Sequence, residues 1–447
     1  VDIHAVGATP AVAVTMVAGA RTAVRPVDGE LAGWNPVLLA GVVGREVLER
    51  AGLDAGALDE VMVGCCDPVG AAGADVARAI VLAAGWPVSV GGLVVDRGET
   101  SGAAAVQAAV AAIRAGQART VLVVGLGLCS VVPPGAAALN RTYGAPWVGV
   151  AERFQEVGGL LPAPRLSDRA AQAAGIGRVE LDTAAEESRR RRAEAGSRPA
   201  AGPSPGAETR PATRSSPGAE TRPAASPAIV AVAARPGDAA GRGVYRGDPL
   251  PADGLRDWGD AAELPPAFDD DGLLTAATFA PPADCVAAVL LQAGAAPVPS
   301  RVAGTGQAGD PSDPLGNAAV AVGRAPDGIA TVAGMGRAAG DPFDPVGDVA
   351  AAVGRALGDA GVELAAVDAI SVVEHDAATA MLVARSLEVD AERVNRDGGA
   401  VATGNAGAAE ELRLITDGLA VPADGQLLLT ISAGPTGSAA IVWSTHI

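Results

Sequence analysis

The sequence predicts an α/β protein made of packed layers of helices and sheet, and three observations support that class. The chain has 447 residues, of which 49% are hydrophobic and 19% charged, so most of it can be packed into cores. Helical and strand-like patterns alternate between residues 36 and 130, and the alternation returns from residue 273 onward. Aromatic residues account for only 2% of the chain, so the cores must be built from Ala, Val and Leu.

In the first of these regions, apolar spacing and glycine stops define each element in turn. A helix is expected where apolar residues recur at helical spacing and end at Gly52 or Gly85. A strand is expected where a short apolar run stands alone, and the run at 120–127 suits a sheet covered on both faces. The predicted order is helix 36–52, strand 58–66, helix 73–85, strand 89–96, a helix after the turn RGETSG, and strand 120–127.

The last part of the chain repeats this order of elements. Its predicted elements are helix 348–363, a strand running into a helix over 365–387, helix 409–420, and two strands joined by a Gly-Pro turn over 426–444. Because both regions read as helix, strand, helix and strands, we interpret the chain as an internal duplication around a loop region.

The region between the two halves has a different character. A charged surface helix is predicted at 178–196. The segment at about 196–227 is rich in Pro, Gly, Ser and Thr, has no apolar period, and is interpreted as a poorly ordered insertion. It holds the direct repeat SPGAETRPA at 204–212 and 216–224, for which replication slippage in a tolerant loop is a simpler explanation than function.

Charge and cysteine content exclude several classes of function. The formal net charge of −18 argues against nucleic acid and anionic membrane surfaces as partners. No apolar run is long enough to span a membrane, and the first residues lack the pattern of a signal peptide, so we expect a cytoplasmic protein. No CxxC spacing predicts a metal site, and no Gly-rich motif predicts a nucleotide site.

The four cysteines do not form a disulfide framework. We interpret Cys65 and Cys66, at the end of a strand, as small buried side chains. Cys129 follows a strand and Cys285 lies in what reads as a helical run, and both are expected in the core.

Several motifs, in order, resemble those of the thiolase superfamily. They include VLERAGLDAGALDEVMVG, the loop-region stretch DRAAQAAGIGRVELDTAAEESRRRRAEA, and DDDGLLTAATFAPPADCVAAVLL. RVNRDGGAVATGNAG and VEHDAATA follow, and the last is similar to the HDcF form of the sterol-carrier-type branch. The resemblance implies two similar βαβαβαββ halves in five α-β-α-β-α layers. It divides the chain into a first half at 1–130 and 262–295, an inserted loop domain at 131–261, and a second half at 296–447.

The resemblance also implies site positions, at which the residues differ from those of the family. Glu99 stands in RGETSG where the family has its nucleophilic Cys, and Asn405 stands at the family's His. Ser432 stands at the second Cys, which serves as the base. His375 is kept as a candidate at the oxyanion position. The implied thioester-binding positions are Ala280, where the family has Ser, and Gly434.

These residue types predict that carbon–carbon bond chemistry is absent. Ser432 cannot ionise as a Cys does, and Asn405 can donate a hydrogen bond but cannot accept a proton. Glu99 has two readings: a carboxylate that only stabilises a helix N-terminus, or a base or nucleophile acting on an acyl thioester. Thr100 and Ser101 could be read as nucleophiles, but His375 is the one candidate base for them. Ser101 is expected to cap the helix instead, as is Asp376.

Two functions therefore stay open. In the first, a thiolase-like protein uses Glu99 for altered acyl transfer, hydrolysis or decarboxylation of a thioester carried by coenzyme A or a carrier protein. In the second, a non-catalytic subunit scaffolds or regulates a partner enzyme. We expect no permanently bound cofactor, and a homodimer or a heteromer with a related subunit.

Overall fold

The structure is a computed structural model, and it describes residues 12–139, 148–153, 161–197, 229–230, 261–294, 329–419 and 424–446. The direct repeat, and nearly all of the insertion expected at 196–227, lie outside the described residues. Within the described part, no helix is both long enough and apolar enough to cross a membrane.

The described strands form one mixed sheet in the order β4-β3-β5-β7-β1-β8-β11-β10-β9. Parallel pairs join β3 to β4 and β5, and β9 to β10, whereas the other neighbours on this path are antiparallel. The strands are β1 (Val14–Thr22), β3 (Glu60–Cys65), β4 (Gly91–Val95), β5 (Thr120–Leu128), β7 (Ala283–Ala293), β8 (Ile329–Ala338), β9 (Ala369–Val373), β10 (Leu427–Gly434) and β11 (Gly437–His446). The short strands β2 (Arg25–Pro26) and β6 (Ile229–Val230) pair with β7 and β1.

The sheet consists of two similar halves that meet where β1 pairs with β8. In the first half β3, β5, β7 and β1 follow one another across the sheet, and in the second half β9, β10, β11 and β8 do the same. In both, the first pair is parallel and the next two are antiparallel. The internal duplication predicted from the sequence is therefore confirmed.

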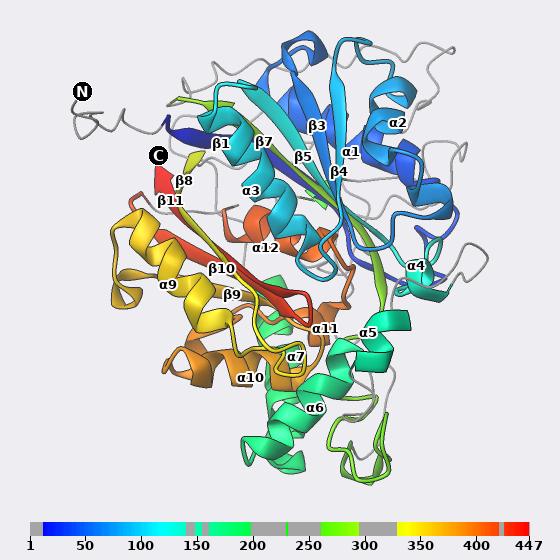
Figure 1. Cartoon of the computed structure of the whole chain (residues 1–447), viewed down its shortest axis with the longest axis vertical. Helices are drawn as coiled ribbons and strands as arrows, with labels where there is room; N and C mark the ends of the chain where they lie inside the picture. The colour runs from blue at the N-terminus through cyan, green and yellow to red at the C-terminus, as the bar shows by residue number, and fades with distance from the viewer. Residues whose placement is uncertain are drawn as a thin grey trace, which may run out of the picture.

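Helices form three layers around the two halves of the sheet (Figure 1). Helices α1 (Pro36–Ala51) and α2 (Val76–Ala83) cover the outer face of the first half. Helices α9 (Val349–Ala360) and α10 (Ala377–Ser386) cover the outer face of the second half. Between the halves lie α3 (Ser101–Arg114) and α12 (Ala409–Gly418), which share one apolar core. The predicted α-β-α-β-α arrangement is thus confirmed.

Local signals in the sequence account for helix boundaries. Asn35 Oδ1 accepts a hydrogen bond from the Val37 amide at 2.9 Å and caps α1, which ends at Gly52 with a φ of 64°. Gly361, with a φ of 69°, ends α9 in the same way. The other α-helices among the described residues are α4 (Ala136–Leu139), α5 (Val148–Arg153), α6 (Ala163–Ala173), α7 (Arg178–Ser197) and α11 (Ala400–Thr403).

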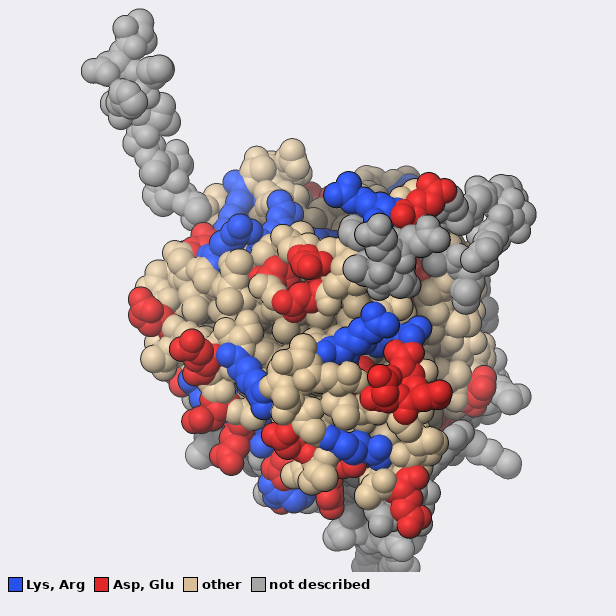
Figure 2. Space-filling view, turned by 60° about the horizontal axis from the view of Figure 1, so that its bottom comes forward, with Lys and Arg blue, Asp and Glu red and all other residues tan. Residues whose placement is uncertain are grey.

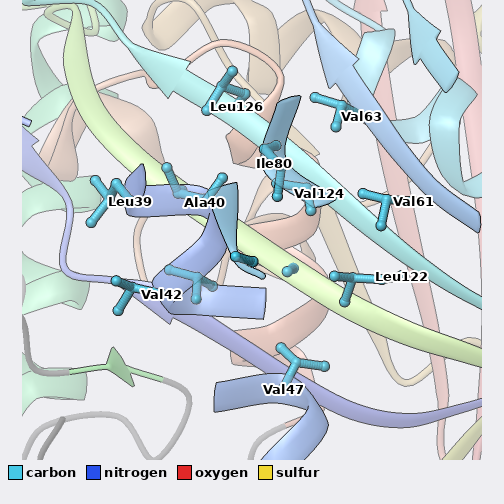
Figure 3. Close-up of a cluster of buried hydrophobic side chains, with 14 of the residues drawn as sticks. Leu39, Ala40, Val42, Val47, Val61, Val63, Ile80, Leu122, Val124 and Leu126 are labelled. Atoms are coloured by element: carbon cyan, nitrogen blue, oxygen red, sulfur yellow. The ribbon is translucent and has the colours of Figure 1, made fainter. Parts of the chain in front are cut away.

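The cores consist mainly of aliphatic side chains, as the composition predicts. Figure 3 shows one of them, where side chains of α1 and α2 lie against those of β3 and β5. Every residue of β5 is buried, which confirms that this strand is covered on both faces. On the face in Figure 2, acidic and basic side chains of the described residues are interspersed.

Cys285 corrects the sequence prediction. It lies in β7, where all the residues of ADCVAAVLL are buried, and not in a helix. A strand that is buried on both faces has no alternation of polar and apolar residues, so its pattern is easily read as helical. The expectation that Cys285 is in the core is confirmed, since it is 0% exposed.

A buried ion-pair network ties α12 to β1 in the middle layer. Arg21 of β1 is 0% exposed and its Nε lies 2.8 Å from Asp417 Oδ1. Arg413 contacts the same Asp417 carboxylate and lies 2.8 Å from Glu410 Oε2. The network fixes α12 against the sheet, and the N-terminal end of this helix follows the loop that holds Asn405.

Candidate active site

The turn that holds Glu99 is fixed by hydroxyl groups. Ser101 Oγ accepts a hydrogen bond from the Arg97 amide at 2.8 Å and donates one to the Gly98 carbonyl at 2.6 Å. Thr100 Oγ1 donates to the Arg97 carbonyl at 3.0 Å. The prediction that Ser101 caps α3 is wrong: Thr100 stands at the N-cap position without a side-chain cap bond, and the Ser101 hydroxyl binds the preceding turn instead. The two hydroxyls hold Glu99 at the mouth of the helix.

Glu99 faces the second half of the molecule. Its half-buried carboxylate lies beside the turn between β10 and β11, with Oε2 3.3 Å from Thr436 Oγ1. A Cβ atom added to Gly434 would lie 3.0 Å from the same oxygen, and one added to Gly98 would lie 2.7 Å from Thr436 Cγ2. The two halves therefore meet closely at Glu99, and Gly434 leaves the space that the carboxylate occupies.

His375 and Asn405 form a hydrogen-bonded pair. Asn405 Nδ2 lies 3.2 Å from His375 Nδ1 and donates to the Glu374 carbonyl at 3.0 Å. Asn405 Oδ1 accepts from the Gly407 amide at 2.8 Å. Because an amide group can only donate to Nδ1, the proton of a neutral His375 ring is assigned to Nε2. That buried Nε2 has no hydrogen-bond partner among the described residues, so it is a donor left for a ligand.

Ala280 lies in a segment that connects the loops of His375 and Asn405. Its amide donates to the His375 carbonyl at 2.9 Å. The next residues of this segment bind the other loop: the Asn405 amide donates to the Pro281 carbonyl at 2.8 Å, and the Ala283 amide donates to the Asn405 carbonyl at 2.9 Å. The segment therefore sets the spacing between the two loops.

Acidic residues on both sides of His375 are buried. Asp376 Oδ1 accepts from the Thr379 amide at 2.9 Å, so the prediction that Asp376 caps a helix is confirmed. Glu374 accepts from the Val401 amide and from Asn395, each at 3.0 Å. Burial raises the pKa of both carboxyl groups to about 7.

Ser432 has a buried partner, Glu411, that was not predicted from the sequence. Its hydroxyl donates a hydrogen bond to the Glu411 carboxylate of α12, and both residues are buried. The local sequence AEELRL reads as an ordinary charged helix, and only the position of α12 between the two halves buries this carboxyl group.

Cys66 lies near both Glu99 and the loop of Asn405 and Gly407. Burial, and then the nearby charge of Glu99, raises the pKa of its thiol. A Cβ atom added to Gly407 would lie 3.5 Å from Cys66 Sγ. Cys65, Cys66 and Cys129 all line a small cavity of about 60 Å³ that also contacts Gly407. Burial raises the pKa of Cys65 to about 11 and that of Cys129 to about 12, so these thiols stay protonated at neutral pH.

The structure thus arranges the predicted residues in two neighbouring groups. Hydrogen bonds connect His375, Asn405 and Ala280, while Glu99 lies against Gly434. Ser432 is two residues before Gly434 in β10 and faces Glu411. Glu411 and the site contact of Cys66 were not predicted from the sequence, because neither residue belongs to a recognisable local pattern.

Comparisons with known proteins agree with this architecture. The thiolase N-terminal domain family matches residues 14–199, and the thiolase C-terminal domain family matches residues 327–442. An acetyl-CoA acetyltransferase of Pseudomonas aeruginosa is 30% identical over 407 residues, which cover 88% of each chain. A steroid 3-ketoacyl-CoA thiolase of Mycobacterium tuberculosis is 38% identical over 117 residues, or 26% of this chain and 29% of that protein.

Solved structures show the same fold. A thiolase from Ascaris suum in complex with coenzyme A superimposes with a TM-score of 0.68 at 21% identity, covering 97% of this chain and 100% of the other. An acetyl-CoA acetyltransferase from Syntrophomonas wolfei gives a TM-score of 0.67 at 22% identity, covering 97% and 99%. With matched sequence over both halves and the matching fold, the chain belongs to the thiolase family of acyl-CoA acyltransferases.

Proposed function

We propose that this chain binds an acyl-CoA thioester and that Glu99 directs water, or another acceptor that is not a carbanion, at the thioester carbon. The observation that carries the proposal is the position of Glu99, half-buried at the start of α3 and pressed against Gly434. A carboxylate in that position can take a proton from the attacking group. The relatives named as acetyltransferases and the relative bound to coenzyme A support the choice of substrate.

His375 has the chemistry to stabilise the reacting carbonyl. Its Nε2–H would donate a hydrogen bond to the thioester oxygen as negative charge develops there. Asn405 would hold the ring in the required tautomer through Nδ1, since both of its amide hydrogens are directed at Glu374 and His375. In this proposal Asn405 positions His375 and does not bind the oxyanion itself.

The state of the thiols favours hydrolysis or acyl transfer over carbon–carbon bond chemistry. A thiolase-type nucleophile must be a thiolate, and the raised pKa values of Cys65, Cys66 and Cys129 keep these side chains protonated. Ser432 is enclosed with Glu411 and supplies no thiolate.

The test compares the wild-type chain with Glu99→Gln. Each protein is incubated with acetyl-CoA and, separately, acetoacetyl-CoA, and free thiol is followed with time. We expect release of coenzyme A by the wild type and a loss of about 100-fold or more in Glu99→Gln. Asp96→Asn, in the same turn, is the matched control, because Asn keeps the oxygen that accepts from the Gly98 amide. Equal rates for wild type and Glu99→Gln would contradict the proposal.

A second candidate is a non-catalytic subunit that regulates a partner enzyme. It is favoured by the engagement of Asn405 and Ser432 with other side chains, which leaves these two positions without a free reactive group. Purification from the native source would then recover a stoichiometric partner, and the chain alone would turn over neither thioester. Turnover by the isolated chain would rule this candidate out.

We also propose that the chain forms a homodimer through the edge of the first half. Strand β4 is at the end of the sheet path and pairs with β3 alone among the described strands. Its Leu93 is 40% exposed, and Leu82 of α2 nearby in the same half is 52% exposed. Light scattering of the purified chain should give twice the mass of 43.7 kDa, whereas a monomer mass at micromolar concentration would contradict the dimer.

A further inference from the structure

Glu411 is a buried carboxyl group that the proposed function does not use. It lies in the first turn of α12, between the two halves of the sheet, and is 2% exposed. The Ser432 hydroxyl donates a hydrogen bond to its Oε2, whereas Oε1 has no hydrogen-bond partner among the described residues. A carboxyl group in such a place is costly unless its chemistry is needed or its proton is retained.

Glu411 lies on the same side of β10 as Glu99. Ser432 and Gly434 are two residues apart in this strand, so they point to the same face and are separated by about 6.5 Å. Ser432 binds Glu411, and Gly434 lies against Glu99. A Cβ atom added to Gly102, in the first turn of α3, would lie 3.0 Å from Glu411 Cβ. The two carboxyl groups therefore border the same end of β10.

The surroundings of the two carboxyl groups differ. Glu99 is half-buried, whereas burial raises the pKa of Glu411, and the hydroxyls of Ser432 and Thr430 offset part of that rise. The charged neighbours on α12, Glu410 and Arg413, are paired with each other. The face of β10 offers Glu411 only hydroxyls, and α3 offers it Gly102. Two carboxyl groups in unlike surroundings are the arrangement from which acid and base roles arise.

We propose that Glu411 and Ser432 form a proton relay to the leaving sulfur of the thioester. The inference rests on the proposed function, in which Glu99 directs water at the thioester carbon. Serine alone is too weak an acid to protonate a thiolate, but a hydroxyl that receives a proton from a carboxyl group can pass one on. Ser432 is the catalytic residue of the pair, and Glu411 acts through it.

The steps balance in atoms and charge. Water forms a bond to the thioester carbon and gives a proton to Glu99. The Ser432 O–H turns from Glu411 Oε2 toward the sulfur, and the carbon–sulfur bond breaks. The sulfur keeps the electron pair and takes this proton, while the protonated Glu411 carboxyl group gives its own proton to Ser432 Oγ. The products are a carboxylic acid and the coenzyme A thiol. The proton on Glu99 then passes through solvent to Glu411, which returns the site to its starting state.

The kinetic test uses Glu411→Gln, Ser432→Ala and the double variant. Each single change should lower kcat/KM for acetyl-CoA hydrolysis about 100-fold, and the double variant should be no slower than either, because the residues act as one unit. The fall in wild-type rate at high pH, where Glu411 loses its proton, should be absent in Glu411→Gln. Thr416→Val, which removes a buried hydroxyl of α12 that donates to the Arg413 carbonyl, is the control and should keep the wild-type rate. Additive losses, or an unchanged high-pH limb in Glu411→Gln, would overturn the relay.

An infrared measurement tests the relay without turnover. Glu374 and Asp376 are also buried carboxyl groups with raised pKa values, so the signal of Glu411 is isolated by subtracting the spectrum of Glu411→Gln. At pH 7 this difference should contain the wild-type band of a buried, protonated carboxyl group, and the band should be shifted in Ser432→Ala. If no thioester is hydrolysed but this band behaves as expected, the proposed reaction fails while the proton-bearing pair stands. If the band is missing from the wild type, the relay fails even where Glu99-dependent hydrolysis is observed.

Discussion

Replacement of Glu374 by Gln should change the way in which stability depends on pH. The carboxyl group of Glu374 is buried next to His375, and burial raises its pKa from 4.5 to about 7. This difference corresponds to about 3 kcal/mol of destabilisation when the group is ionised in the folded state. The change to Gln removes the ionisation, but it turns an NH₂ group toward one of the two donors that Glu374 binds, the Val401 amide or Asn395.

The sign follows from the order of deprotonation. Below pH 4.5 the group is protonated in both folded and unfolded chains, so it has no effect. Between pH 4.5 and about 7 the unfolded chain ionises first, and stability falls as the pH rises. Above about pH 7 the full destabilisation persists. Glu374→Gln lacks this fall, so its stability relative to wild type should increase by about 2 kcal/mol between pH 5 and pH 8.

The assay is reversible urea unfolding at both pH values, followed by tryptophan fluorescence. The fluorescence reports on the core because Trp443 is 0% exposed. The lost hydrogen bond costs the variant about 1 kcal/mol at every pH, so this cost cancels when its stabilities at pH 5 and pH 8 are subtracted. Glu392→Gln, at an exposed position, is the matched control and should follow the wild type. The reasoning is refuted if Glu374→Gln and wild type lose the same free energy of unfolding between pH 5 and pH 8.

Three further changes test how the site is held. A methyl group at Gly127 would lie 1.7 Å from the Ala406 carbonyl oxygen, so Gly127→Ala should lower the free energy of unfolding by about 1–3 kcal/mol. Because Ala406 is next to Asn405, the same change should displace the Asn405 loop and reduce thioester turnover. Arg21→Met removes one of the two guanidinium partners of Asp417 and leaves Arg413 as the other, so urea unfolding should show a loss of about 1–3 kcal/mol; unchanged stability would mean that the Arg21 ion pair is not a constraint. Asn35→Ala removes the cap of α1 and should cost about 1 kcal/mol, with Asn35→Ser restoring stability; equal stability of both variants would argue against the cap.

Local sequence signals predicted most of the fold. Gly52 marks the end of a helix because the left-handed conformation favours glycine, and the hairpin of β10 and β11 was predicted from the turn between two apolar runs. Cys285 was assigned to a helical run because a strand buried on both faces lacks the alternation that distinguishes strands.

The candidate site was predictable only in part. Glu99 and His375 were predicted because they lie within sequence motifs that resemble those of the family. This resemblance could not give the bonds between side chains, which decide that Asn405 orients His375 and that Ser432 binds Glu411. Glu411 looks like a surface residue in its local sequence, and its burial arises from the packing of α12 between the two halves.

The most direct test of the central claim is a crystal structure of the Glu99→Gln chain with acetyl-CoA, since this variant should bind the thioester without consuming it. We expect the thioester carbonyl oxygen within hydrogen-bond distance of His375 Nε2 and the carbonyl carbon next to residue 99. Acetyl-CoA bound with its thioester away from both residues, or no bound acetyl-CoA at saturating concentration, would contradict that claim.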